Sequence, residues 1–278
     1  MKTFNDEIEN IGRLSNRAPI FDGIVNEHKY LSSNIKLMWI LKDANSTGED
    51  ESYDLREAIN TLKRDYGIRK DWENTFRNII YVTNGILNDA SWEDIPYPKD
   101  DPSTVDILQN IAFINVKKVG GGSRSKENEI YNHYQKYKAI LFEQIDEFNP
   151  DVIIFGNTYR YFKEDLGLNQ MNIFGSCHAT VKDNRIYLSA YHPNARIKEK
   201  VYFDDIMTAY NAFRKVSQNL YSERSFKEHI MNLTTEMDVL VKKIDNMQSK
   251  LINVQKFEKA ADLRALKMKV LEAKRILS

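Results

Sequence analysis

Four short apolar segments, separated by longer stretches with helical periodicity, constrain the fold of this chain more than any other feature. Each segment is rich in β-branched or large aliphatic residues and is bounded by turn or helix signals, which is the pattern of a buried strand. They occupy residues 36–41, 111–116, 151–155 and 185–190. Apolar strands without alternation are covered on both faces, as in parallel sheets. The segments therefore predict a three-layer α/β sandwich around a central, mostly parallel four-stranded sheet.

The clearest helical pattern lies between the second and third of these segments. Apolar side chains recur at helical spacing from Ile130 to Phe148, which predicts an amphipathic helix over residues 129–148. The pattern stops before Pro150, as expected because proline does not continue a helix. Since strand, helix and strand follow one another in this way, we expect residues 1–217 to form one layered α/β domain.

The last sixty residues follow a different pattern. Their apolar residues alternate steps of four and three, which is the heptad spacing of a helix that packs against another helix. These residues are Leu233, Met237, Leu240, Ile244, Met247, Leu251 and Val254. A break near Asn253 and a second helical segment from about Phe257 predict a helical hairpin or coiled coil over residues 218–278. This segment has twelve Lys or Arg and eight Asp or Glu, a net charge of +4, and the first 217 residues therefore carry −4.

Composition excludes several classes of protein. The 278 residues include forty Lys or Arg and forty Asp or Glu, so the net charge offers no argument for binding to nucleic acid or to membranes. A single cysteine, Cys177, excludes a disulfide framework and an all-cysteine zinc or iron–sulfur site within the chain. No signal-peptide pattern is present, and no apolar stretch approaches about 18 residues. We therefore expect a cytoplasmic protein that is neither secreted nor membrane-spanning.

Polar residues accompany the ends of three of the four predicted strands. Asp43 comes after the first strand, Asn115 lies at the end of the second and His192 follows the fourth. Ligands of open α/β sheets bind outside the carboxyl ends of the strands, where the loops converge. We therefore expect these three side chains to mark an active site, although each one alone would also suit a helix cap, a turn or a structural histidine.

Together these residues resemble the motifs of the uracil-DNA glycosylase superfamily over residues 35–205. The similar features are an acidic loop after the first strand, the strand-end Asn115, Gly156 closing the third strand and the His-Pro loop at His192. The resemblance implies that Asp43 activates water and stabilises a sugar cation, while Asn115 reads the edge of a flipped base. It further implies that His192 donates a hydrogen bond to the base oxygen as the leaving group gains negative charge.

Neighbouring residues extend this predicted site. Lys42 precedes and Ala44 follows the acidic residue, at positions where the family commonly has Pro and Gly, so Asn45 is an alternative to Asp43 as the active polar group. Ala44 and Asn194 are predicted to bind the base. A nucleotide in the pocket would place its phosphates at the basic rim of the site. The predicted phosphate contacts are Lys117, Lys118, Ser123, Arg124 and Arg196.

The predicted chemistry requires no metal or other cofactor. Breaking an N-glycosidic bond builds positive charge on the sugar and negative charge on the base, so a carboxylate and a hydrogen-bond donor on opposite sides both stabilise the transition state. Between the first two motifs, Trp72, Phe76 and Trp92 each suit either stacking on a base or packing in the core.

The resemblance leads us to expect a monofunctional DNA glycosylase that hydrolyses the N-glycosidic bond of a flipped uracil or modified base. Water would be the attacking group, since no lysine nucleophile stands out among the motif residues. Two alternatives keep the same fold. One is a non-catalytic nucleotide-binding or DNA-binding module, and the other is a glycosylase that excises hypermodified bases from phage DNA. The −4 charge of the first 217 residues argues against tight nonspecific binding to DNA.

The segment 257–264, with the sequence FEKAADLR, resembles the signature of the UVR helical hairpin of bacterial excision-repair proteins and of Clp-type chaperone and adaptor proteins. Small Ala260 and Ala261 would let two helices approach closely, while Phe257 and Leu263 fill the seam between them. The resemblance implies docking to a protein partner or self-association through residues 233–275. A generic coiled coil is the alternative.

Overall fold

The computed structural model describes residues 2–44, 51–121, 126–253 and 257–277. The chain divides into two compact units, Met1–Ser217 and Gln218–Ser278. The boundary falls within helix α7 (Glu199–Asn253), whose first turns pack in the core of the first unit. In the described part of the chain, no helix combines the length and the apolar character needed to cross a membrane.

The elements follow one another in a mixed order of short strands and helices. The α-helices are α1 (Asn5–Ser15), α2 (Glu27–Ser32), α3 (Leu55–Asn60), α4 (Glu73–Asn88), α5 (Glu127–Phe148), α6 (Tyr159–Phe162), α7 and α8 (Phe257–Leu277), with 3-10 helices at Lys70–Trp72, Trp92–Asp94 and Pro102–Asn110. The strands are β1 (Ile20–Phe21), β2 (Gly23–Ile24), β3 (Leu37–Leu41), β4 (Tyr53–Asp54), β5 (Lys63–Arg64), β6 (Gly67–Ile68), β7 (Ile111–Asn115), β8 (Val152–Gly156), β9 (Asn172–Phe174), β10 (Cys177–Lys182) and β11 (Arg185–Ala190).

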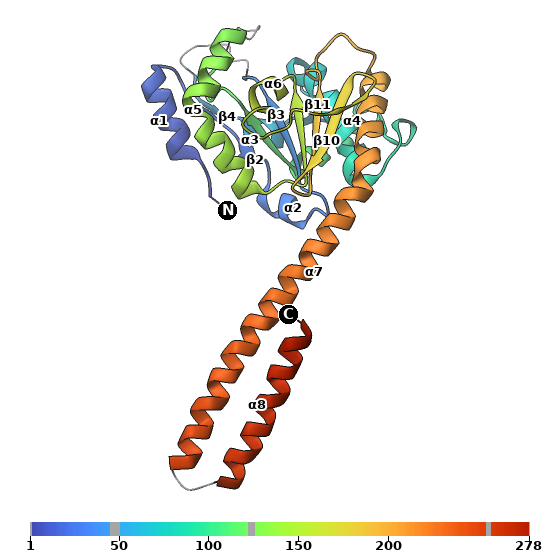
Figure 1. The fold of residues 1–278 in the computed structure, drawn as a ribbon. Coiled ribbons are helices and arrows are strands. Elements are labelled where there is room, and N and C mark those ends of the chain that lie inside the picture. The colour runs from blue at the N-terminus through green and yellow to red at the C-terminus, as the bar shows by residue number, and fades with distance from the viewer. Residues whose placement is uncertain (1, 45–50, 122–125, 254–256, 278) are drawn as a thin grey trace. The chain divides into compact units, whose positions relative to one another are not determined.

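The main sheet has seven strands, in the spatial order β2-β7-β3-β8-β11-β10-β9. Figure 1 labels β2, β3, β11 and β10 of this sheet. Its four central strands correspond to the four apolar segments of the sequence, and neighbours within this group are parallel. At one edge β2 pairs antiparallel with β7, and at the other edge β10 pairs antiparallel with both β11 and β9. The predicted four-stranded, mostly parallel sheet is therefore corrected to a mixed sheet of seven strands.

The three additional strands lack the apolar runs that mark the central ones. Strand β2 has two residues and begins with Gly23. In β10, buried Cys177 and Ala179 flank exposed His178, which is the alternation of a strand that faces a core on one side only. Such short or alternating segments give a weak signal in the sequence, and this explains why the edges of the sheet were not predicted.

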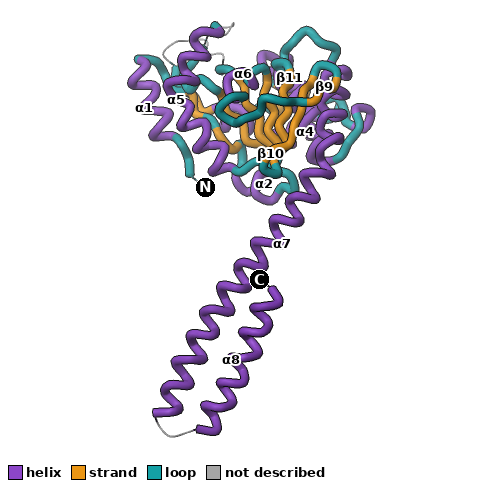
Figure 2. Tube along the Cα trace, viewed as in Figure 1, coloured by secondary structure: helices purple, strands orange, loops and turns teal. Residues whose placement is uncertain are grey.

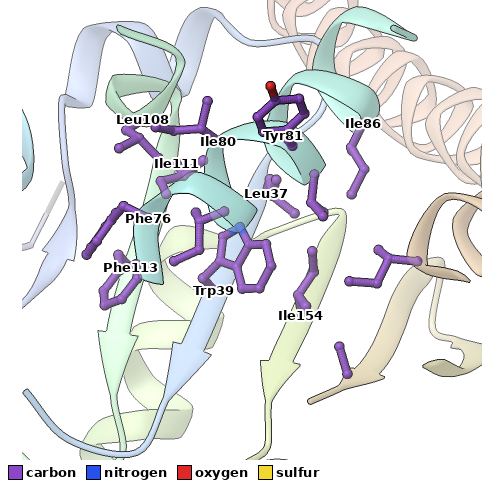
Figure 3. Packing of buried hydrophobic residues seen from close by; sticks show 14 of the residues in the cluster. Leu37, Trp39, Phe76, Ile80, Tyr81, Ile86, Leu108, Ile111, Phe113 and Ile154 are labelled. Atoms are coloured by element: carbon purple, nitrogen blue, oxygen red, sulfur yellow. The ribbon is translucent and has the colours of Figure 1, made fainter. Parts of the chain in front are cut away.

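Helices cover both faces of the sheet and make three layers (Figure 2). Successive side chains of β3 point to opposite faces. Leu37 and Trp39 enter the cluster that α4 and the start of α7 cover, whereas Met38 and Ile40 enter the cluster beneath α1 and α5. Figure 3 shows part of the first cluster, with Trp39 among its side chains. The indole N–H of Trp39 also donates a hydrogen bond of 3.3 Å to the Thr83 hydroxyl on α4.

The central strands are buried along their whole length. Every residue of β3, β7 and β8 is buried. Full burial of a large apolar side chain contributes about 1.5–3 kcal/mol to the free energy of unfolding. A strand that is buried on both faces needs an apolar residue at nearly every position. Apolar runs in the sequence therefore predict the positions of these strands well.

A buried charged cluster joins the edge of this sheet to α5. The Lys118 ammonium lies 2.8 Å from Oδ2 of Asp22 and donates to Oε1 of Gln144 at 2.7 Å. Gln144 Nε2 and the backbone N–H of Asn115 donate to the same carboxylate, at 2.9 and 2.8 Å. These four residues are at most 2% exposed. Because a buried charge without a partner is very unfavourable, β7, α5 and the segment before β2 must be in place together.

The second unit consists of the later part of α7 and helix α8. Salt bridges join the two helices, from Lys267 to Asp245 at 2.6 Å and from Lys274 to Asp238 at 2.5 Å. The Gln248 side chain on α7 also donates to the Ala260 carbonyl oxygen on α8, at 3.2 Å. The order of these pairs shows that the two helices run antiparallel.

The core of this helical unit is small. Among its described side chains, Ile244 and Ala260 are the hydrophobic ones that are buried. Ala261 is exposed and Leu263 is half-buried, so Ala260 lies at the helix interface and Ala261 does not. The heptad residues Leu240 and Met247 remain 44% and 54% exposed. Two helices alone therefore leave much of the apolar pattern uncovered.

We expect Lys118→Met to lower the free energy of unfolding by about 3–5 kcal/mol, because it leaves the buried Asp22 carboxylate without its cation. Lys63→Met is the matched control, since Lys63 pairs with Asp106 at 2.6 Å on the surface, where side chains are 45% and 37% exposed, and such pairs contribute about 1 kcal/mol or less. Urea unfolding measures both variants. Equal losses would show that the buried cluster has no special role in stability.

Candidate functional site

The carboxyl ends of the four parallel strands lie side by side in the order β7, β3, β8, β11. Asn115 pairs with Leu41 across β7 and β3, so Asp43 follows two residues beyond this pair. The segments that follow β3 and β7 remain side by side, because the backbone N–H of Lys117 donates to the Lys42 carbonyl oxygen at 2.8 Å. His192 follows β11 at the far end of this row. The topology therefore brings the three predicted residues to one edge of the sheet.

Gly156, at the end of β8, allows Leu41 and Pro193 to pack closely at this edge of the sheet. A Cβ atom added there would clash with the Leu41 side chain and lie 3.3 Å from Pro193. The amide of Asn78 on α4 donates a 2.6 Å hydrogen bond to the Pro193 carbonyl oxygen. Glycine at this position thus lets the His192 loop approach the end of β3, and α4 holds the loop there.

Asn115 presents a buried amide group that is not fully satisfied. The residue is 2% exposed, and its backbone N–H is held by Asp22. Among the described residues, its side-chain nitrogen Nδ2 finds no hydrogen-bond acceptor. Leaving a buried donor unpaired costs about 1–3 kcal/mol. A ligand with a carbonyl oxygen at this position would remove that cost.

His192 is held as a neutral hydrogen-bond donor. The backbone N–H of Asn194 donates to Nδ1 of the imidazole at 3.1 Å, so in the neutral ring the proton resides on Nε2. Burial, with a smaller effect of the nearby Lys42 charge, lowers the pKa of His192 to about 4. At neutral pH the ring therefore offers an uncharged Nε2–H. Asn194 acts through its backbone, whereas its side chain is exposed.

The Asp43 carboxylate is enclosed by its neighbours. Its side chain is 5% exposed, and its Oδ2 lies 3.8 Å from the ammonium of Lys117. A Cβ atom added at Gly121 would clash with this carboxylate, so the close approach of the loop requires glycine. The backbone N–H of Gly121 donates to the Ala44 carbonyl oxygen at 3.0 Å. Gly121 therefore packs directly against the acidic residue.

A second charged cluster surrounds Lys42, whose side chain is 10% exposed, whereas that of its partner Glu127 is 48% exposed. Its ammonium pairs with Glu127 at the start of α5, and the Tyr161 hydroxyl donates to the same carboxylate at 2.6 Å. Burial alone raises the pKa of Glu127, but the hydrogen bonds from Lys42 and Tyr161 outweigh it and leave this pKa below its ordinary value. Because Glu127 holds Lys42 in place, the positive charge that helps to keep His192 neutral has a defined position.

Several predicted contacts differ from the expectation. Lys117 and Lys118 are each 1% exposed, so their prediction as phosphate-binding rim residues was wrong. Beyond the end of β7 the backbone stays hydrogen-bonded to Leu41, Lys42 and Ile20. The two lysines turn inward to carboxylates that include Glu129, 3.2 Å from Lys117. Ala44 is 9% exposed and packs in the hydrophobic core, so its contact with a base stays a prediction. Arg196 is exposed, as a phosphate contact requires.

Three predicted residues cannot be placed in this site. Asn45, Ser123 and Arg124 lie outside the described residues. The alternative between Asp43 and Asn45 as the active polar group therefore stays a prediction.

The three aromatic residues proposed for stacking pack in the core. Phe76 is buried and stacks on Phe113 with ring centres 5.5 Å apart. The ring centres of Trp72 and Phe76 are 5.3 Å apart. Trp92 stacks on Tyr81 at 4.2 Å. Core packing, the alternative given for each of them, therefore explains their positions.

Tyr53 is an aromatic residue of this region that the sequence did not single out. It lies on β4, packs against the first core cluster and is partly buried. Burial raises the pKa of Tyr53 to about 12, with Arg69 lowering it and the Asp43 charge raising it further. Tyr53 is thus close enough to Asp43 to sense its charge. The signal for Tyr53 in the sequence is its position ten residues after Asp43, whereas the prediction of stacking names Trp72, Phe76 and Trp92.

Two clefts are described in the first unit, with volumes of about 230 and 250 Å³. Asp43, Asn115 and His192 do not line either of them. The smaller cleft borders the predicted site, because Tyr191 lines it and directly precedes His192. Within the described ranges, no group of three or more His, Cys, Asp or Glu is arranged to hold a metal ion.

Comparison with known proteins does not identify the chain. No protein-family model matches it, and no curated protein has a significantly similar sequence.

We expect protonation of His192 to destabilise the fold as the pH falls from about 6.5 to about 4. The folded-state pKa of about 4 lies below the ordinary value of 6.5, so the unfolded chain binds more protons in this window and stability rises with pH through it. His133, whose pKa burial also lowers to about 4, contributes in the same direction. Urea unfolding between about pH 4.5 and about pH 7 measures this effect. The free energy of unfolding of His192→Gln should rise less steeply with pH than that of the wild type. An unchanged slope would contradict a partly buried His192 that stays neutral.

Proposed function

We propose that residues 1–217 form a monofunctional DNA glycosylase that hydrolyses the N-glycosidic bond of a flipped uracil or modified base. The observation that carries this proposal is the buried Nδ2 of Asn115, a donor without an acceptor among the described residues. A flipped base offers a carbonyl oxygen on its edge that such a donor recognises. Support also comes from the neutral His192 and from Asp43 at the same edge of the sheet.

In this proposal each residue acts on a different part of the substrate. The bond between the sugar C1′ and the base nitrogen breaks, and the base leaves with the electron pair. The Nε2–H of His192 donates a hydrogen bond to the base oxygen that gains negative charge. The Asp43 carboxylate stabilises the positive charge on the sugar and accepts a proton from the water that attacks C1′. Asn115 orients the base through its amide.

Lys117 requires a separate argument, because a lysine among the site residues could act as a nucleophile. The expectation of water attack assumed that no such lysine is present, yet Lys117 lies 3.8 Å from Asp43. Its ammonium is also paired with Glu129 at 3.2 Å, and the residue is 1% exposed. An ammonium held by two carboxylates has no free lone pair. Water therefore remains the proposed attacking group.

We expect the purified protein to leave alkali-labile abasic sites in DNA that contains uracil or a modified base. Asn115→Ala, His192→Ala and Asp43→Asn should each reduce the excision rate by about 10²–10³-fold, the effect of removing one group that stabilises the transition state. Asn172→Ala, at an exposed residue of β9, is the control and should excise normally. The substrates include uracil DNA and DNA from phages with modified cytosine, beside unmodified DNA.

Absence of abasic sites in every substrate, with identical behaviour of the variants in cells, would contradict the glycosylase. A second candidate function is a non-catalytic module that holds a nucleotide or a damaged base. It is favoured by the enclosure of Asp43, which is 5% exposed and paired with Lys117, because a carboxylate that activates water must reach the substrate. Binding of a modified nucleotide without turnover, lost in Asn115→Ala, would support this second function.

For residues 233–275 we propose self-association through the two helices. Large apolar side chains on both helices are exposed within the unit, and covering them with the helices of a second copy would bury more apolar area. These are Val239, Leu240, Met247, Leu266, Met268 and Leu271. A different protein that offers a helical face is the other occupant of this surface.

We expect the full chain to be a dimer in size-exclusion chromatography with light scattering, and Leu240→Glu to shift it to a monomer. A charged side chain cannot be buried in an apolar interface without a large cost. Leu31→Glu is the matched control, since Leu31 on α2 is 45% exposed and Leu240 is 44% exposed. Unchanged helix content by circular dichroism would show that the variants fold. A monomeric wild-type chain would reject self-association.

A further inference from the structure

The cleft of about 230 Å³ beside the His192 loop has a polar lining that suits an anion. Arg160, Ser176, His178 and Ser189 line it, and all four side chains can donate hydrogen bonds. His178 and Ser189 are cross-strand partners on β10 and β11, so they share one face of the sheet. No carboxylate is among the residues that line the cleft. A phosphate group would therefore find donors on the lining residues, while the nearby carboxylates of Glu127 and Asp205 are already paired with Arg160 and with the Ser176 backbone N–H.

Arg160 is held in a defined position at this cleft. Its guanidinium donates to the Asn157 side-chain oxygen at 3.0 Å and lies 3.4 Å from the Glu127 carboxylate. The residue is exposed, and a guanidinium has five N–H donors. These two contacts leave donors available to a ligand. Because the Arg160 side chain is already ordered by these contacts, a ligand that binds it causes a smaller further loss of conformational entropy.

Two tyrosines give the cleft aromatic surface. The Tyr159 hydroxyl donates to the Leu168 carbonyl oxygen, which fixes this ring. Tyr191 is 52% exposed, although its backbone carbonyl oxygen accepts a hydrogen bond of 3.0 Å from the Tyr202 hydroxyl. The backbone of Tyr191 is therefore anchored while its ring remains open to solvent. An exposed ring on a held backbone is a suitable surface for stacking, because little order has to be gained on binding.

We propose that this cleft binds one nucleotide of single-stranded nucleic acid, next to the nucleotide that enters the site at His192. The base stacks on Tyr191, and the phosphate accepts hydrogen bonds from Arg160, His178 and the serine hydroxyls. The Cα atoms of Tyr191 and His192 are about 3.8 Å apart because they are consecutive, so one strand can reach both places. A base that stacks on Tyr191 must be unpaired, and this makes a single strand the substrate class.

This inference rests on the proposed function for the order of the two nucleotides, but its test measures binding alone. The probe is a fluorescein-labelled oligothymidylate of about eight nucleotides, within the range that one such binding surface covers. Fluorescence anisotropy at one fixed salt concentration gives the Kd, since phosphate contacts make binding salt-dependent.

We expect Tyr191→Ala to weaken binding of the probe about tenfold, which is the effect of one lost base–aromatic stack. Tyr191→Phe keeps the ring and should bind as the wild type does. Tyr131→Ala is the matched control, since Tyr131 on α5 is also 52% exposed, and it should bind normally. The Tyr191 variants keep the backbone carbonyl that Tyr202 contacts, so they are expected to fold.

Equal affinities of Tyr191→Ala and Tyr131→Ala for the probe would overturn the proposal. Wild-type binding to a duplex of the same sequence as tight as to the single strand would also overturn it, because a paired base cannot stack on Tyr191. A tenfold loss in Tyr191→Ala without base excision by the wild type would support the cleft and reject the glycosylase. Excision that depends on Asn115 but does not change in Tyr191→Ala, with equal probe binding, would reject the cleft alone.

Discussion

The buried cluster of Asp22, Lys118 and Gln144 is the interaction on which the arrangement of the site depends. Three segments that are distant in the sequence supply these groups, and each group would be unfavourable in the interior without the others. Asp22 also accepts the backbone N–H of Asn115, so the cluster sets the position of this residue at the end of β7. Stability and the placement of the candidate site therefore share one set of contacts.

The first turn of α5 extends the same principle to the other strands. Glu127 holds Lys42 after β3, and Glu129 holds Lys117 after β7. Acidic residues are favourable at the start of a helix because of its dipole, and here they also neutralise two lysines that turn into the protein. With these cations paired, the edge of the sheet carries uncharged groups on Asn115 and His192 beside the Asp43 carboxylate.

The two units differ in how far their own contacts satisfy their sequences. In the first unit, the apolar strands are covered on both faces and the sheet edges are paired with short strands. In the second unit, few of the described apolar side chains are buried, and Leu240 and Met268 remain exposed. The α/β unit therefore buries its apolar strands by its own contacts. The helical unit instead leaves apolar surface that another chain could cover.

The sequence by itself determined the central strands, the helix that ends at Phe148 and the helical character of the last sixty residues, because burial leaves periodic apolar patterns. It also brought Asn115 and His192 to one edge, since parallel strands share their carboxyl ends. Only the tertiary structure decided that Lys117 and Lys118 turn inward, that Gly121 packs on Asp43 and that Tyr53 lies near this carboxylate. Whether a lysine is solvated or buried depends on partners from distant segments, and no local pattern records them.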